Sequence, residues 1–138
     1  MNVPVTEPSA VLQPVSCDSD VVAARQLART LAVGIGFSRP DQALIATAVS
    51  ELARNIVKYA DEGEIELCSV VSGVKSGIKV TARDRGPGLE DVELAMQDGY
   101  STGNSLGLGL PGTRRIVDDF KIRSEPGSGL VVTVVKWR

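Results

Sequence analysis

An acid and an amide four residues apart form the first pair whose spacing suggests chemistry. Glu51 and Asn55 lie in the segment ELARN, inside a long stretch with helical periodicity. Residues four apart on a helix lie one turn above each other on the same side. Asn supplies a neutral oxygen to a hard cation such as Mg²⁺, and Glu can accept a proton from an attacking hydroxyl. The pair favours ion coordination with proton abstraction, and a solvated helix face is the alternative.

A second group, DRGPG, places an acid before two glycines. Asp84 ends a predicted strand, and Gly86 and Gly88 follow it. The carboxylate can accept a hydrogen bond from an exocyclic amine, and residues without a Cβ let the backbone pass close to a flat ligand. This pattern indicates a pocket for a base, and an ordinary β-turn is the alternative.

A third group, GLGLPG, opens a helix with Gly107, Gly109 and Gly112. Backbone N–H groups at a helix N-terminus bind phosphate, and glycine allows a close approach. The same letters occur in dinucleotide sites, where a hydrophobic strand leads directly into the first glycine. Here the preceding residues are DGYSTGNSL, which do not form a strand pattern, although Glu125 lies about 20 residues on, where a ribose-binding acid would fall. Phosphate binding without a dinucleotide fold is favoured, and a plain glycine turn is the alternative.

The composition excludes several other classes of chemistry. The chain of 138 residues has no histidine and two cysteines, so His-based triads and structural zinc sites are excluded. A net charge of −2 argues against a nucleic-acid partner. We find no apolar run long enough to cross a membrane and no signal-peptide pattern at the N-terminus. We therefore expect a cytoplasmic protein with neither nucleic-acid nor membrane partners.

The elements that must position these groups follow from periodicity and from turn residues. We expect a helix within 18–37, capped by Ser19 or Asp20 and ended by Gly34 and Gly36. A second helix, within 38–60, carries a capping-box pattern at Ser38 and carries Glu51 and Asn55. The other predicted elements are an edge strand in 11–17, strands at 65–72 and 78–84 around a turn at 73–77, a short helix in 90–99, a helix in 110–120, and a hairpin of 121–125 and 130–137.

This order of elements predicts an α+β fold, a two-layer sandwich with helices on one face of a mixed sheet. We expect a single domain over 1–138, in which 1–10 form a flexible tail because they hold two prolines among polar residues.

Taken in order, E-x-x-x-N, D-x-G-x-G and G-x-G-x-x-G resemble the N, G1 and G2 boxes of the GHKL ATP-binding superfamily, whose fold is the Bergerat type. The segments VVAARQLART, DQALIATAVSELARNIVKYA, DRGPG, DGYSTGNSLGLGLPGTRRIVDDF and a terminal KW resemble more closely the serine-protein kinases that act as switch proteins in bacterial stress signalling. This resemblance spans roughly residues 18–138.

The resemblance implies a role for each motif residue. It implies ATP and Mg²⁺ as cofactors, with Asn55 as the Mg²⁺ ligand, Glu51 as the base acting on a substrate serine or threonine, and Asp84 as the partner of the adenine amino group. The glycines would shape the base pocket (Gly86 and Gly88) and wrap the phosphates (Gly107, Gly109 and Gly112) beneath a lid at about 89–106. Phosphoryl transfer needs mainly positioning and charge neutralisation, which such a set can supply.

The resemblance also implies partners. Members of this family phosphorylate STAS-domain proteins in the stressosome and, when released, activate a PP2C-type phosphatase. An anti-sigma factor of the same ATP-binding fold, which sequesters a sigma factor, is the alternative function. A non-catalytic scaffold that binds nucleotide is a further alternative, and it would not need a base at Glu51.

The sequence departs from the superfamily pattern at two points. A Gly-Thr pair often lies near the final hairpin and helps to hold adenine, whereas this chain has Gly129-Leu130. Thr133 is near, but its period places it on the opposite strand face from Leu130. No lysine is clearly directed at the γ-phosphate. Arg54, Lys58 and Arg114 are the basic candidates for that contact.

Overall fold

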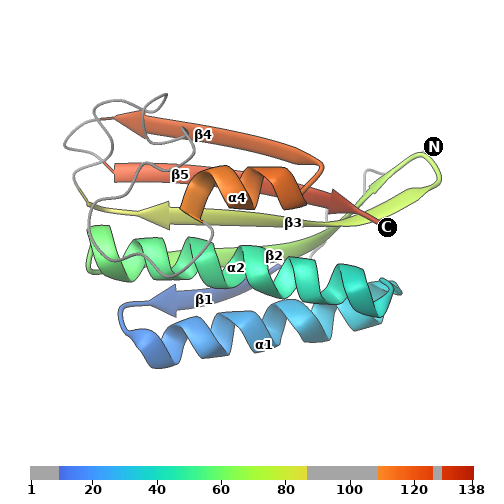
Figure 1. Ribbon diagram of the computed structural model, residues 1–138, viewed down its shortest axis with the longest axis horizontal. Coiled ribbons are helices and arrows are strands. Elements are labelled where there is room, and N and C mark those ends of the chain that lie inside the picture. The colour runs from blue at the N-terminus through green and yellow to red at the C-terminus, as the bar shows by residue number, and fades with distance from the viewer. Residues whose placement is uncertain (1–9, 87–108, 126–128) are drawn as a thin grey trace.

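The computed structural model describes residues 10–86, 109–125 and 129–138. Within these ranges the chain forms a sheet of five strands and three helices (Figure 1). The elements in chain order are β1 (Val11–Val15), α1 (Asp18–Ile35), α2 (Arg39–Tyr59), β2 (Gly63–Ser72), β3 (Lys75–Asp84), α4 (Gly109–Ile116), β4 (Asp119–Glu125) and β5 (Gly129–Trp137).

The sheet has the strand order β1-β2-β3-β5-β4, and its four pairings are all antiparallel. The predicted mixed sheet is therefore wrong in this detail. Two helices lie between β1 and β2, so the chain re-enters the sheet in the opposite direction. The segment from β3 through α4 to β4 does return in the same direction, but β5 lies between those two strands and pairs with both.

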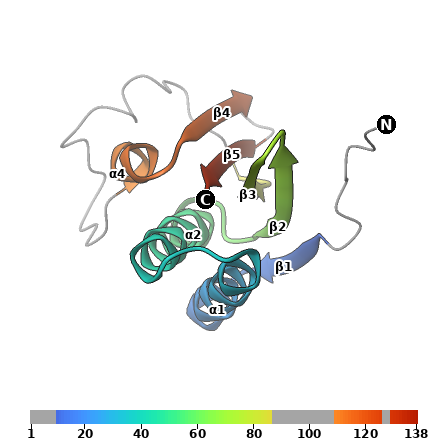
Figure 2. The same ribbon diagram turned by 90° about the vertical axis from the view of Figure 1, so that its right-hand side faces the viewer.

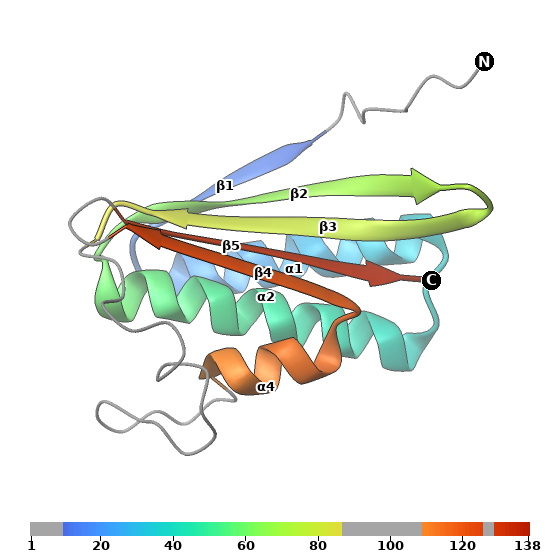
Figure 3. The same ribbon diagram turned by 90° about the horizontal axis from the view of Figure 1, so that it is seen from above.

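The helices lie together on one face of this sheet, as the views from the end and from above show (Figures 2 and 3). The small residues Ala24, Ala28 and Ala32 recur every four positions on α1 and are fully buried, which allows a close approach of α1 to its neighbours. Larger apolar residues from the helix-facing side of the strands complete the core, including Ile65, Leu67, Ile78, Val80, Val132 and Val134. The predicted α+β two-layer arrangement is confirmed.

The helix that carries Glu51 and Asn55 begins as predicted. Ser38 is the N-cap of α2, its side chain accepts a hydrogen bond from the backbone N–H of Asp41 at 3.3 Å, and Pro40 lies in the first turn. The helix extends over 21 residues, which fixes the relative positions of its polar side chains.

The start of α1 differs from the prediction. Cys17 is the N-cap and provides no side-chain cap, while Ser19 and Asp20 already lie inside the first turn. Asp20 instead reaches backwards, and its Oδ2 accepts a hydrogen bond from the backbone N–H of Ser16 at 2.9 Å. At the other end α1 continues through Gly34 to Ile35, and Gly36 alone ends the helix, with φ +100° in the left-handed region that favours glycine.

The hairpin of β2 and β3 is longer than predicted. Pairing continues to Ser72 and Lys75, so the connection is Gly73-Val74 and not the five residues 73–77. Gly73 has φ +62°, which a tight two-residue hairpin turn requires of its first residue. The final hairpin of β4 and β5 is confirmed, with Glu125 paired to Gly129. The helix predicted for 110–120 is shorter, because α4 ends at Ile116 and β4 already begins at Asp119. β1 is an edge strand that tolerates Pro14 as predicted.

Several predictions concern residues outside the described ranges. These are most of the N-terminal tail (1–9), the short helix in 90–99, the lid at about 89–106, and the glycines Gly88 and Gly107. Among the residues that the structure describes, no helix has the length and apolar character that crossing a membrane requires.

Candidate functional site

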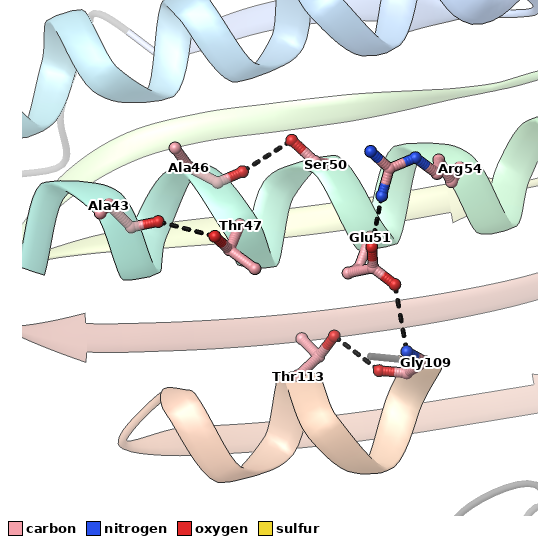
Figure 4. Close-up of polar contacts among 8 residues, drawn as sticks. All are labelled: Ala43, Ala46, Thr47, Ser50, Glu51, Arg54, Gly109 and Thr113. Atoms are coloured by element: carbon pink, nitrogen blue, oxygen red, sulfur yellow. Dashed lines mark hydrogen bonds and ion pairs between the residues drawn. The ribbon is translucent and has the colours of Figure 1, made fainter. Parts of the chain in front are cut away.

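Glu51 lies at the contact between α2 and α4 and is 7% exposed. Its carboxylate is bonded on both oxygens (Figure 4). Oε1 accepts a hydrogen bond from the backbone N–H of Gly109 at 3.1 Å, and Oε2 forms an ion pair with the guanidinium of Arg54. Because the side chain is buried and oriented by these partners, the alternative of a solvated helix face does not hold for Glu51.

The glycine loop reaches this carboxylate at the start of α4. Gly109 has φ +68° and begins the helix, so its N–H belongs to the unpaired donors of a helix N-terminus. Thr113 is fully buried, and its hydroxyl donates to the Gly109 carbonyl at 2.9 Å, which holds this first turn in place. Gly112, which precedes Thr113, is also buried. The structure therefore brings Gly109 beside Glu51, and Gly112 lies in the first turn of the same helix.

Asn55 follows Glu51 by one turn of α2 and is half-buried. No hydrogen bond joins its side chain to another residue of the described ranges. The same ranges contain no cluster of three or more His, Cys, Asp or Glu side chains that could hold a metal. This arrangement fits Mg²⁺, which commonly takes only one or two protein ligands and completes its coordination with phosphate oxygens and water.

Asp84, at the end of β3, is held by two backbone donors. Its Oδ1 accepts hydrogen bonds from the N–H of Gly86 at 3.0 Å and from the N–H of Leu130 at 3.2 Å. No hydrogen bond joins its Oδ2 to another described residue. The bonds to Oδ1 fix the orientation of that second oxygen.

Gly86 is needed for packing at this position. A Cβ on Gly86 would lie 2.6 Å from the Cβ and 2.8 Å from the Cα of Ala60, just beyond the C-terminal end of α2. The absent side chain lets the turn after β3 lie directly against the helix end. The sequence pattern identified Gly86 but gave no signal for Ala60, because that contact joins residues far apart in the chain.

The pair Gly129-Leu130 contacts Asp84 through its backbone. Gly129 has φ +114°, and a Cβ there would lie 2.2 Å from the Asp84 carbonyl oxygen. The N–H of Leu130 bonds the Asp84 carboxylate, while the Leu130 side chain packs on the core. Thr133 lies on the opposite face of β5 from Leu130 and the buried Val132 and Val134, as predicted, so it does not replace the missing threonine.

The three basic candidates differ in their surroundings. Arg54 forms the ion pair with Glu51. The ammonium of Lys58 lies 5.2 Å from the centre of the Tyr59 ring, which is a cation–π contact. Arg114 is exposed on α4. Among the described residues, the ion pair between Arg54 and Glu51 is the contact that joins one of these three to a predicted site residue. The i,i+3 spacing of the two residues is the sequence signal that supports the pair.

The chain matches one described protein family and several named relatives. Residues 15–136 match the histidine kinase-like ATPase domain. The chain is 48% identical over 118 residues to the serine/threonine-protein kinase RsbT of Bacillus subtilis (strain 168), covering 86% of this chain and 89% of RsbT. It is 33% identical over 98 residues to an anti-sigma F factor of Thermoanaerobacter sp. (strain X514), covering 67% of this chain and 68% of that factor.

Two solved structures resemble the fold. A crystal structure of the RsbU and RsbW domains of a Mycobacterium tuberculosis protein superposes with a TM-score of 0.67 at 16% identity, covering 94% of this chain and 33% of that one. The catalytic domain of the histidine kinase ThkA superposes with a TM-score of 0.50 at 18% identity, covering 91% and 95%. At these identities the likeness concerns the fold alone.

Proposed function

This chain belongs to the histidine kinase-like ATPase family, and from that premise we propose that it is an ATP- and Mg²⁺-dependent protein serine/threonine kinase of a bacterial partner switch. The observation that carries the proposal is the hydrogen bond between Glu51 Oε1 and the Gly109 N–H, which joins the base candidate to the phosphate loop across 58 positions of sequence. The 48% identity to RsbT over most of both chains supports serine/threonine-protein kinase activity.

In the proposed reaction Glu51 is the general base. The acceptor hydroxyl of a serine or threonine gives its proton to the Glu51 carboxylate, and its oxygen forms a bond to the γ-phosphorus of ATP. The bond between that phosphorus and the β–γ bridging oxygen breaks, and ADP leaves with the electron pair. Before nucleotide binds, the Gly109 N–H and Arg54 both orient the carboxylate, and the ion pair with Arg54 holds the base in position when the acceptor arrives.

The nucleotide would lie along the C-terminal half of α2. We assign the adenine amino group to the free oxygen of Asp84, beside Gly86 and Leu130. We assign the phosphates to the N-terminus of α4 at Gly109 and Gly112, where N–H donors and the helix dipole favour negative charge. The nine residue steps from Glu51 to Ala60 correspond to about 14 Å of helix, which separates the two ends of one ligand. Gly88 and Gly107 complete this assignment.

Asn55 would hold the magnesium ion with phosphate oxygens. When bound, Mg²⁺ neutralises charge on the transferring phosphoryl group. The position of Asn55 on α2, half-buried and one turn from Glu51, supports this assignment. Arg54 pairs with the Glu51 carboxylate, and this pairing supports Arg54 as the basic residue that we propose for the transferring phosphate.

We further propose STAS-domain proteins of a stressosome-like complex as substrates, and a PP2C-type phosphatase as the target activated after release. The chain would act in the cytoplasm as a single catalytic domain over 1–138. The support for these partners is the relationship to RsbT and the resemblance stated from the motifs.

An anti-sigma factor is the second candidate function. The 33% identity to an anti-sigma F factor over two thirds of the chain favours it. A factor of that kind would bind a sigma factor in stoichiometric amounts, whereas an RsbT-like kinase would not.

The decisive experiment incubates the purified protein with labelled ATP, Mg²⁺ and candidate STAS-domain proteins, followed by mapping of the labelled residue. Label on one serine or threonine, lost in Glu51→Gln, supports the kinase. A stable complex with a purified sigma factor supports the anti-sigma alternative. Label on a STAS protein does not decide between the two functions, because an anti-sigma factor of this fold would still phosphorylate its antagonist.

A further inference from the structure

A polar pocket of about 450 Å³ lies between α1 and α2. The wall on α2 is a stripe at helical spacing from Ala43 to Arg54, and its small members Ala46 and Ser50 leave the floor open. Figure 4 shows the Ser50 side chain pointing toward α1. The opposite wall is α1, with Arg25 and Arg29. Glu51 also lines this pocket, so the base candidate lies between the phosphate loop and the pocket.

The charge of the pocket is concentrated and largely uncompensated. Arg25 and Arg29 lie one turn apart on α1, both exposed, and neither has an acidic partner among the described residues. Arg54 adds a third guanidinium and pairs with Glu51. The chain as a whole carries a net charge of −2, so this pocket is a local exception. Like charges on one helix face repel each other, and an anion between them removes that cost.

The shape favours an extended chain over a small ion. Eleven residue steps along α2, from 43 to 54, correspond to about 16 Å, which is the length of about five residues of extended peptide. Guanidinium groups bind carboxylates in a bidentate, charge-assisted manner. The hydroxyls of Thr47 and Ser50 donate to the carbonyls of Ala43 and Ala46, so toward a bound peptide their oxygens can act as acceptors for N–H groups.

We infer that this pocket is the docking groove for the protein substrate, and that Arg25 and Arg29 bind Asp or Glu side chains close to the acceptor serine or threonine. The acidic segment lies along α2 and places the acceptor hydroxyl at the Arg54 end of the groove, beside Glu51. This inference rests on the proposed kinase function, because it names the feature that the kinase recognises. Arg25 and Arg29 are specificity residues, and they do not touch the transferring phosphate.

The first test measures binding without ATP. Two fluorescent peptides carry the same serine, flanked by Glu in one and by Gln in the other, and their anisotropy is followed with the full chain. We expect the Glu peptide to bind at least about tenfold more tightly, which corresponds to about 1.4 kcal/mol, and its affinity to fall with salt. The variant Arg25→Glu/Arg29→Glu should no longer bind the Glu peptide more tightly than the Gln peptide. Arg123 is an exposed arginine on β4, outside the groove, and the control variant Arg123→Glu should keep the preference for the Glu peptide.

The second test measures phosphorylation of a STAS-domain protein identified by labelled ATP. In Arg25→Glu/Arg29→Glu the KM for the protein should rise at least about tenfold, while the KM for ATP stays unchanged. In Arg25→Gln/Arg29→Gln, which removes the charges without reversing them, the KM for the protein should rise less. Thermal unfolding checks that each variant is folded.

Three outcomes overturn the inference: equal binding of the two peptides, an unchanged protein KM in the charge-reversed variant, or a tenfold loss of ATP affinity in that variant, which would assign the groove to nucleotide phosphates. Failure of the proposed kinase function can be distinguished from failure of the docking inference. In that case the wild type labels no STAS protein, while the two peptides still bind differently.

Discussion

The backbone N–H of Gly109 donates a hydrogen bond of 3.1 Å to Glu51 Oε1, so the first residue of α4 is joined to the middle of α2. This donor belongs to the helix N-terminus where we place the nucleotide phosphates. A carboxylate and a phosphate oxygen are both anionic acceptors for such a donor. We therefore expect bound nucleotide to compete with Glu51 for this N–H and to leave one carboxylate oxygen for the acceptor hydroxyl.

Glu51→Gln tests the base. The amide keeps a carbonyl oxygen for the Gly109 N–H but cannot accept a proton, so phosphoryl transfer should fall by about 10²–10⁴-fold. The lost ion pair to the half-exposed Arg54 should change the free energy of unfolding by about 1 kcal/mol or less. Transfer of label from ATP and urea unfolding measure the two effects.

Glu62→Gln is the matched control, because Glu62 is exposed beyond the end of α2. It should leave transfer unchanged. Full transfer activity in Glu51→Gln would remove Glu51 from the mechanism.

Asn55→Ala tests the ion ligand. Removing the carboxamide should weaken the binding of Mg²⁺-ATP by about tenfold, or about 1.4 kcal/mol, with little effect on binding of ATP in the presence of a chelator. Asn55→Asp retains an oxygen ligand and should keep the Mg²⁺ dependence. Calorimetric titration with and without Mg²⁺ makes the comparison, and equal affinities in wild type and Asn55→Ala would contradict the assignment.

Asp84→Asn tests the adenine contact. The Asn oxygen can still accept from the N–H groups of Gly86 and Leu130, so the melting temperature of the free protein should change little. The other group becomes an NH₂ donor, which cannot accept from the adenine amine but can donate to the oxygen of inosine. Affinity for ATP should fall by about tenfold or more, and the preference for ATP over ITP should shrink.

Equilibrium binding of both nucleotides, with thermal unfolding, makes this measurement. A large loss of stability with unchanged ATP affinity would identify Asp84 as part of a structural turn only.

Gly86→Ala tests the packing at the end of α2. The new methyl group would lie 2.6 Å from the Ala60 Cβ, so the turn or the helix end must shift. We expect a loss of about 1–3 kcal/mol in the free energy of unfolding. Gly34→Ala is the control, because a Cβ there meets no atom within 4 Å. Because Gly34 lies within α1, Gly34→Ala should raise the free energy of unfolding by about 0.5–1 kcal/mol. Urea unfolding compares the two, and equal effects would contradict this reading of Gly86.

Asp20 contributes to the dependence of stability on pH. The Ser16 backbone N–H that donates to its carboxylate lowers the pKa of Asp20 below its usual range. Because the folded-state pKa is the lower one, its contribution is present above the unfolded-state pKa and is lost as the pH falls through the folded-state pKa. Wild type should therefore exceed Asp20→Asn in unfolding free energy at neutral pH, and the difference should vanish in strong acid. A difference that stays constant across the titration would exclude this linkage.

Much of the candidate site was predictable because its signals are local. The apolar repeat and the Ser38 cap define α2, and the spacing of Glu51 and Asn55 then places both on one side of it. The turn residues likewise predicted the hairpin of β4 and β5, and Pro14 predicted an edge strand. The predictions of helix caps and strand ends were less accurate. Cys17 caps α1 in place of Ser19 or Asp20, and β3 begins at Lys75, because nearby residues compete for the same backbone groups.

The sequence by itself determined which residues could do chemistry and on which helix or strand each lies, since periodicity and turn chemistry act over a few residues. Only the tertiary structure decided that Gly109 bonds Glu51, that Leu130 bonds Asp84, and that β5 lies between β3 and β4. These contacts join residues 46 and 58 positions apart or depend on the order of whole strands. They form when the apolar faces of the helices and the sheet are buried together, and no local pattern records which distant backbone donor then meets a given carboxylate.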